Sequence, residues 1–162
     1  MVLARTRPLA MLAMATLLVL FIVALLADVI ATHDPLAQDV ARRLRTPGAD
    51  HFFGTDGFGR DVFSRVVHGS RASLLVGSVS VSLGSVVGVS IGIVSAYWGG
   101  KADVLAQRGV DILLGFPPLV MALIMVVALG PSTGSVSIAI AVALAPQVAR
   151  VSRASALSIK GE

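Results

Sequence analysis

The chain has 162 residues, of which 56% are hydrophobic and 14% charged, with 13 basic residues, 9 acidic residues and no cysteine. A soluble domain of this size cannot bury so much apolar surface, because its surface-to-volume ratio is too high, so lipid is the expected solvent. The basic residues are scattered without interleaved aromatic residues, which argues against a nucleic-acid partner. The lack of cysteine excludes disulfides and thiolate chemistry within this sequence.

The first apolar run extends from Leu9 to Ala27, without a charge, and follows Arg5 and Arg7. As a helix it would be ~28 Å long, close to the thickness of the hydrocarbon core. The alternative is a cleaved signal peptide, with Val29-Ile30-Ala31 as its cleavage site. Signal peptides usually have apolar regions of about 7–15 residues. The longer run favours a transmembrane helix within residues 1–30.

The second uncharged run predicts a span at about residues 72–97. It carries Gly84, Gly88 and Gly92 at four-residue spacing. Residues four apart lie on one helix face, so these glycines form a smooth strip where a neighbouring helix can approach closely. The strip predicts helix packing within a multi-helix bundle.

The last uncharged run is 38 residues long and begins at Ile112, which suits two crossings. A turn composition at residues 130–134 divides it. The predicted spans are therefore about 112–129 and 135–149. Pro117 and Pro118 remove backbone donors inside the third run, and we expect either a kink there or a helix that starts there.

The predicted fold class is therefore an all-α, polytopic membrane helical bundle with four transmembrane helices. Its parts are an N-terminal helix (1–30), a polar segment (31–71) and a helical domain (72–162). The basic residues divide almost evenly between the two sides of the membrane. The Arg pair before the first span favours a cytoplasmic N-terminus. Residues 31–71 would then lie outside the cytoplasm, and the 98–111 loop inside.

No motif in the sequence predicts catalysis. Residues 88–92 match the G-x-S-x-G pattern of serine hydrolases, but that motif needs a strand–turn–helix elbow, and here it lies inside an apolar helix. We therefore interpret the match as coincidence. Lys101 follows a glycine but precedes Ala102, so there is no Walker A motif. If ATP drives this protein, another polypeptide binds the ATP.

The three histidines are His33, His51 and His68, all in the polar segment. Their spacing matches neither H-E-x-x-H nor H-x₃-H. The sequence therefore predicts no metal site and no cofactor.

The stretch from His51 to Arg65 is rich in glycine and charge, which favours a tight, folded loop. Thr55 or Asp56 could cap a short helix. Asp61 and Arg65 stand four residues apart, a favourable spacing for an ion pair. Apolar residues from Val62 onward repeat at helical spacing, which predicts a short amphipathic helix on the membrane surface before the second span.

This stretch resembles the permeases of the dipeptide/oligopeptide/nickel family of ABC importers, specifically their C-type subunit. The family pattern is H-x-x-G-T-D-x-x-G-R-D-x-x-S-R-x-x-x-G-x-R-x-S-L. Three further features agree with it: Tyr97-Trp98-Gly99-Gly100, Asp111 followed by Phe116-Pro117, and Gly130-Pro131. The matching motif residues here are His51, Gly54, Thr55, Asp56, Gly59, Arg60, Asp61, Ser64, Arg65, Gly69, Arg71, Ser73 and Leu74.

The resemblance implies a subunit of a heteromeric importer in the bacterial plasma (inner) membrane. Its partners would be a sister permease subunit, two ATP-binding subunits and an extracytoplasmic solute-binding protein. The permease itself would catalyse no reaction and hold no cofactor. Transported solutes in the family include peptides and nickel chelates, and the sequence does not choose among them. Family members continue into a coupling loop and six spans in all. This chain stops at Glu162, so we expect a fragment or a truncated gene.

Two other classes compete with the importer interpretation. A small channel or a secondary transporter usually places an ionisable residue within a span, and the four runs contain none. A membrane-anchored enzyme would have to build its domain from residues 31–71. About 40 residues without cysteine and with few apolar positions are too few for a stable independent domain.

Overall fold

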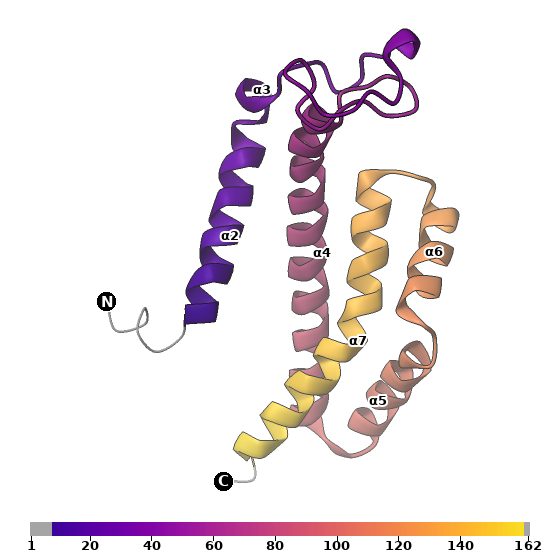
Figure 1. The fold of residues 1–162 in the computed structure, drawn as a ribbon. Coiled ribbons are helices and arrows are strands. Elements are labelled where there is room, and N and C mark those ends of the chain that lie inside the picture. The colour runs from indigo at the N-terminus through magenta and orange to yellow at the C-terminus, as the bar shows by residue number, and fades with distance from the viewer. Residues whose placement is uncertain (1–7, 161–162) are drawn as a thin grey trace. The chain divides into compact units, whose positions relative to one another are not determined.

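The computed structural model describes residues 8–160 and shows helices joined by loops, with no strand element in that range (Figure 1). Arg5 and Arg7, on which the predicted orientation depends, lie outside the described residues, as does Glu162. The chain forms two compact units, one up to Leu74 and one from Leu75 onward.

The first unit contains an apolar helix, a folded loop and the beginning of a long helix. Helix α2 (Pro8–Leu25) is followed by the short helix α3 (Ala27–Ile30) and, within the loop, by the 3-10 helix η1 (Val40–Arg42). The large side chains of α2 are apolar and almost all exposed. A helix that is apolar on every face suits a lipid environment.

Helix α4 (Val62–Trp98) has 37 residues and is shared by the two units. It is ~55 Å long, more than enough to cross a bilayer. The prediction of a separate surface helix before the second span is wrong, because α4 runs without a break through residues 71 and 72. No proline interrupts this stretch, so nothing ends the helix before the membrane span begins.

The second unit continues with α5 (Gly100–Leu114), α6 (Pro118–Leu129) and α7 (Thr133–Lys160). Both α5 and α6 pack on α7. Residues 98–111, predicted as a loop, are mostly the helix α5. The third apolar run is divided between α5 and α6, whose axes differ in direction by 89°. Helix α6 starts at Pro118, because proline is well accommodated in the first turn of a helix. The residue that precedes a proline is disfavoured in the helical conformation, so α5 ends before the proline pair.

Helix α7 contains the whole of the predicted fourth span, 135–149, and continues to Lys160 despite Pro146 in its interior. By length and hydropathy, α4 and α7 can each cross a membrane, and the bent α5–α6 pair can form a third crossing. The apolar part of α2, Leu9–Leu25, is shorter. Within the described residues, the structure therefore supports two or three membrane-capable elements in an all-helical protein.

Candidate functional sites

The loop between α3 and α4 depends on two glycines for its path. Gly54 and Gly59 have φ angles of +71° and +75°, in the left-handed region that favours glycine. A Cβ atom on Gly54 would lie 2.3 Å from the carbonyl oxygen of Arg45, and one on Gly59 would lie 1.7 Å from that of Asp39. Backbone segments of the loop therefore pass over each other at the two glycine positions.

Asp56 accepts more hydrogen bonds through its side chain than any other described residue of this loop. Its carboxylate accepts the backbone N–H groups of Phe58 at 2.8 Å and Arg60 at 3.0 Å, and the Nε–H of Arg60 at 2.8 Å. Arg65 reaches the same carboxylate from the first turn of α4. Desolvation by itself would raise the pKa of Asp56, but the hydrogen bonds and the nearby guanidinium outweigh it and lower that pKa to about 2.

Thr55 joins the two halves of the loop through its side chain. The hydroxyl donates to the carbonyl of Arg42 and accepts the backbone N–H of Arg45 at 2.9 Å. The backbone of Thr55 also pairs with that of Asp61 in an antiparallel bridge. Because Thr55 is buried, these bonds are shielded from competing water.

Asp61 precedes the first residue of α4 and caps that helix. One carboxylate oxygen accepts the backbone N–H of Ser64 at 2.8 Å, and the other lies 2.9 Å from Nδ1 of His51. Burial raises the pKa of Asp61, yet the bonds from Ser64 and His51 lower it on balance. The predicted Asp61–Arg65 ion pair is wrong, since Arg65 binds Asp56 instead. The cap is likewise Asp61, and neither Thr55 nor Asp56.

Arg71 connects the C-terminal end of α2 to α4. Its Nε donates to the carbonyl of Ala24 at 2.6 Å, and its guanidinium pairs with Asp28 at 2.8 Å. His68, one turn earlier, also lies near Asp28, at 3.2 Å. Carbonyl groups at a helix C-terminus lack intrahelical partners and attract cations, so Arg71 satisfies groups that α2 cannot.

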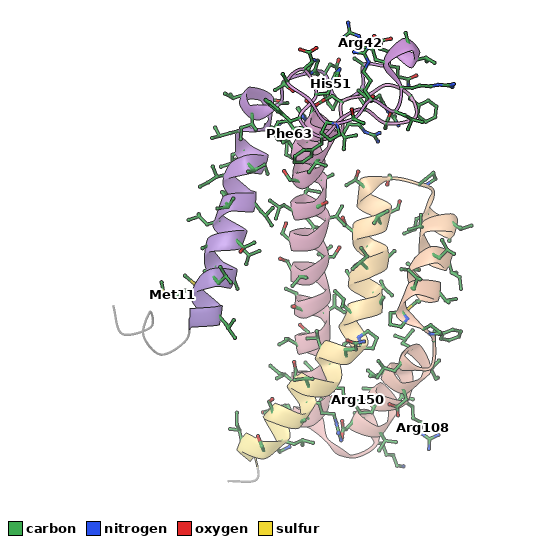
Figure 2. All side chains as sticks on the ribbon, in the orientation of Figure 1. Met11, Arg42, His51, Phe63, Arg108 and Arg150 are labelled. Carbon is green, nitrogen blue, oxygen red and sulfur yellow. The ribbon has the colours of Figure 1, made fainter. Side chains whose placement is uncertain are left out.

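The motif therefore has two structural parts. Nine of its residues, from His51 to Arg65, gather in the loop and the first turn of α4, near the labelled His51 and Phe63 in Figure 2. Arg71, about two turns further along α4, forms the second part by binding the C-terminal end of α2 and Asp28. A Cβ on Gly69 would meet nothing within 4 Å, and the structure gives no reason for a glycine there. Asp28 and Arg42, which the sequence did not single out, are partners of the motif.

The glycine strip of α4 faces α7 in the second unit. A Cβ on Gly84, Gly88 or Gly92 would lie 3.0, 2.6 or 2.5 Å from a backbone oxygen of α7. Those oxygens belong to Ala141, Ala145 and Ala149, which are all buried. Two rows of small residues thus bring the helix backbones into direct contact. The alanines also recur every four residues, a signal that the sequence analysis missed.

The register of this contact shows that α4 and α7 are parallel. Each glycine meets an alanine 57 positions later. The same offset relates the buried Ser80 to Ser137, whose carbonyl accepts the Ser80 hydroxyl at 3.0 Å. A constant offset along two helices arises only when they run in the same direction. Figure 1 shows the two helices side by side.

Charged groups gather where α7 passes the ends of α4 and α5. Arg153 on α7 binds Asp103 on α5, with Nε 2.6 Å from the carboxylate, and Arg150 (labelled in Figure 2) pairs with Asp111. Lys160 donates to the carbonyls of Ala96 and Tyr97 at the end of α4, at 3.2 and 3.0 Å. These bonds hold the three helices together at this end of the unit.

Pro117 and Pro118 lie at the bend between α5 and α6. Pro117 has an extended backbone and precedes the helix, while Pro118 occupies its first turn. The bend thus separates a helix with several charged residues from an entirely apolar one.

Comparison with known proteins agrees with this architecture at both ends of the chain. Residues 5–47 match the family model described as the N-terminal TM domain of oligopeptide transport permease C. Residues 88–162 match the binding-protein-dependent transport system inner membrane component. The first match covers α2, α3 and the first part of the folded loop, and the second covers the end of α4 and α5 to α7.

Individual relatives are transport permeases. The protein named "probable D,D-dipeptide transport system permease" of Escherichia coli K12 is 44% identical over 131 residues, covering 81% of this chain and 44% of the relative. Dipeptide transport system permeases of Alkalihalophilus pseudofirmus and Bacillus subtilis are 37% and 36% identical, over 87% and 94% of this chain and 46% and 48% of theirs.

The chain thus spans about half the length of these relatives. The two family matches and the relatives all describe the same kind of membrane component, a transport permease and not an enzyme. The all-helical fold with its membrane-capable apolar helices agrees with that description. The chain belongs to the family of binding-protein-dependent inner-membrane transport permeases, with the C-type peptide permeases as its relatives.

Proposed function

We propose that this chain is part of the membrane-spanning permease subunit of an ATP-driven importer, and forms part of the translocation path for small peptides or similar solutes. The observation that carries the proposal is the pair of family matches at residues 5–47 and 88–162, together with relatives named as dipeptide permeases. The packed, parallel α4–α7 pair supports it, because a transport bundle needs helices held in fixed register.

The proposed topology has four crossings with a cytoplasmic N-terminus. Two neighbouring helices that both cross the membrane in the same direction require a return crossing between them, and the bent α5–α6 pair supplies it. Helix α2 is the remaining crossing. The folded loop then lies outside the cytoplasm, and the charged group around Arg150 and Arg153 lies inside, where basic residues accumulate.

In this proposal the subunit works with a sister permease, two ATP-binding subunits and a solute-binding protein outside the bacterial inner membrane. ATP binding and hydrolysis in the partners would switch the permease pair between outward-open and inward-open states. Coupling of this kind requires two states whose free energies the partners change. The tight α4–α7 contact and the ion pairs at its charged end would let the second unit move as a body.

The experiment is to purify the complete transporter from its native membranes through a tag on this subunit. The expected partners are a second permease and two ATPases, identified by mass spectrometry. After reconstitution in nanodiscs, ATP hydrolysis should rise when a peptide-loaded binding protein is added, and not when the binding protein is empty. Recovery of the subunit without any ATPase, or hydrolysis indifferent to peptide, would contradict the proposal.

A further inference from the structure

Three side chains that are far apart in the sequence meet beside the start of α4. His33, His51 and Asp61 each place one potential metal-ligating atom within 4.8 Å of the other two. The imidazole rings of His33 and His51 lie 4.6 Å apart between centroids, tilted by 31°. The three residues line a cavity of about 140 Å³, which Asp34 and Asp39 line as well.

His51 is the unusual member of this cluster. Its side chain is only 9% exposed, and its Nδ1 lies 2.9 Å from a carboxylate oxygen of Asp61. Its Nε2 is buried and has no hydrogen-bond partner in the part of the chain that the structure describes. A buried polar atom without a partner costs free energy, so this nitrogen points to a ligand that binds there.

The environment of His51 favours a metal ion as that ligand. Histidines that bind metals commonly hold their second ring nitrogen against a carboxylate, which fixes the tautomer and makes the free nitrogen more basic. Asp61 has this relation to His51. Two imidazole rings whose centroids lie 4.6 Å apart are close enough to share one cation. Asp34 adds negative charge to the cavity, whereas the charge of Asp39 is paired with Arg42, which also lines it.

We propose that His33 and His51 bind one divalent transition-metal ion, such as Zn²⁺, with the free Nε2 of His51 as one ligand and with Asp61 orienting the His51 ring through Nδ1. Imidazole nitrogen is an ordinary ligand of Zn²⁺, and water can occupy the remaining positions. The exposed ring of His33 can adjust to the distance that the metal requires. Mg²⁺ and Ca²⁺ prefer all-oxygen ligands and fit this set poorly.

A metal ion here would connect three parts of the folded loop. His33 precedes η1, His51 lies in the glycine-rich stretch, and Asp61 caps α4. A metal that binds the folded loop but not the opened loop stabilises the folded state by mass action. Local opening of residues 31–61 should therefore become rarer as the metal concentration rises above the dissociation constant. The proposed metal site is therefore structural: it stabilises the folded loop that carries the motif.

The test uses the complete transporter in nanodiscs, treated with a chelator and then titrated with Zn²⁺. Amide hydrogen exchange in peptides covering residues 31–61 should slow, up to about 100-fold at a hundred times the dissociation constant. The parent should also retain one more Zn²⁺ per subunit than His33→Ala, measured by elemental analysis. His33 is the residue to change because it is exposed, so its loss leaves the fold intact.

His68→Ala is the matched control, since His68 is in the same unit but binds Asp28 instead of the cluster. It should respond to Zn²⁺ as the parent does, while His33→Ala should lose the response. Mg²⁺ should have no effect on any of the three proteins. An equal response in the parent and His33→Ala, or a loss in both variants, would overturn the proposal. Slowing by Mg²⁺ as strong as that by Zn²⁺ would do the same.

Discussion

Single residues decide the path of the motif loop, and Gly59 is the most constrained of them. Its φ of +75° and the carbonyl of Asp39 leave no room for a side chain. Gly57 stands two positions earlier in the same loop, and a Cβ there would meet nothing within 4 Å. The two glycines differ in physical constraint, and only the constrained one, Gly59, belongs to the motif.

Gly59→Ala should therefore destabilise the loop, while Gly57→Ala should not. A left-handed non-glycine residue costs ~1–2 kcal/mol before the clash is added, which corresponds to a rise in local opening of about 5- to 30-fold. The measurement is the rate of tryptic cleavage at Arg42 and Arg43 in the complete transporter. Equal cleavage rates for the two variants would show that the loop tolerates a side chain at both positions.

Asp56 makes the loop sensitive to acid. Its pKa falls from an ordinary 3.8 to about 2 in the folded loop. The ionised carboxylate therefore stabilises the fold fully above pH ~4, and that contribution is lost as the pH falls toward ~2. Asp56→Asn removes the contribution at every pH.

The parent loop should accordingly resist proteolysis better than Asp56→Asn at pH 5, and the difference should shrink as the pH approaches 2. Pepsin cleaves in this range, and the exposed Phe52 and Phe53 offer sites. Comparing the two proteins at each pH removes the pH dependence of the protease. A difference that stays constant from pH 5 to pH 2 would show that Asp56 does not titrate in this window.

At the scale of residues, the sequence predicted a tight loop but not which of its side chains pair with each other. A tight loop followed from its glycines, and the resemblance identified its motif. The predicted Asp61–Arg65 pair followed from helical spacing, yet Asp61 binds the distant His51 and Arg65 binds Asp56. Local spacing cannot show which long-range pairing forms when the chain turns back on itself. The meeting of His33 with His51 was hidden for the same reason.

Elements were easier to predict where an apolar run was long. The runs in α2, α4 and α7 are visible in the sequence, and α6 begins at Pro118, one of the two outcomes expected from the proline pair. Helix α5 was missed because its charged residues, among them Lys101 and Asp103, made it look like a loop. Its contact with α7 gives the acidic residues Asp103 and Asp111 their partners, Arg153 and Arg150.

The α4–α7 contact leads to a prediction at the scale of elements. Gly88→Leu places a side chain where the backbone of Ala145 lies 2.6 Å from a Cβ, so the helices must separate. Overpacking of this kind costs about 1–3 kcal/mol. Gly77→Leu on the same helix is the control, because a Cβ there meets nothing within 4 Å.

Thermal stability of the purified transporter, followed by loss of monodisperse complex on heating, measures the difference. Gly88→Leu should lower the midpoint by several degrees or prevent assembly, and Gly77→Leu should leave it near that of the parent. If Gly77→Leu is as damaging as Gly88→Leu, the glycine strip has no special packing role.

For the whole molecule, the parallel register of α4 and α7 restricts the possible topologies. Apolar length alone supports two or three crossings. The parallel pair makes a return crossing through α5 and α6 necessary if both helices span the bilayer. The sequence predicted four spans without this register, and that number stays a prediction. It placed the third span at about 112–129, with a kink or a helix start at the proline pair, whereas the structure divides this run between α5 and α6, whose axes differ in direction by 89°.

The topology is tested most directly by fusing a reporter enzyme that is active only outside the cytoplasm to three positions: Asp50, Asp103 and Ser132. The fusions at Asp50 and Ser132 should be active, because the proposed topology puts the folded loop and the α6–α7 turn outside the cytoplasm. The fusion at Asp103 should be silent. Activity at Asp103 together with silence at Asp50 would reverse the orientation. Silence at Ser132 with activity at Asp50 would remove the return crossing and contradict the permease topology proposed for this chain.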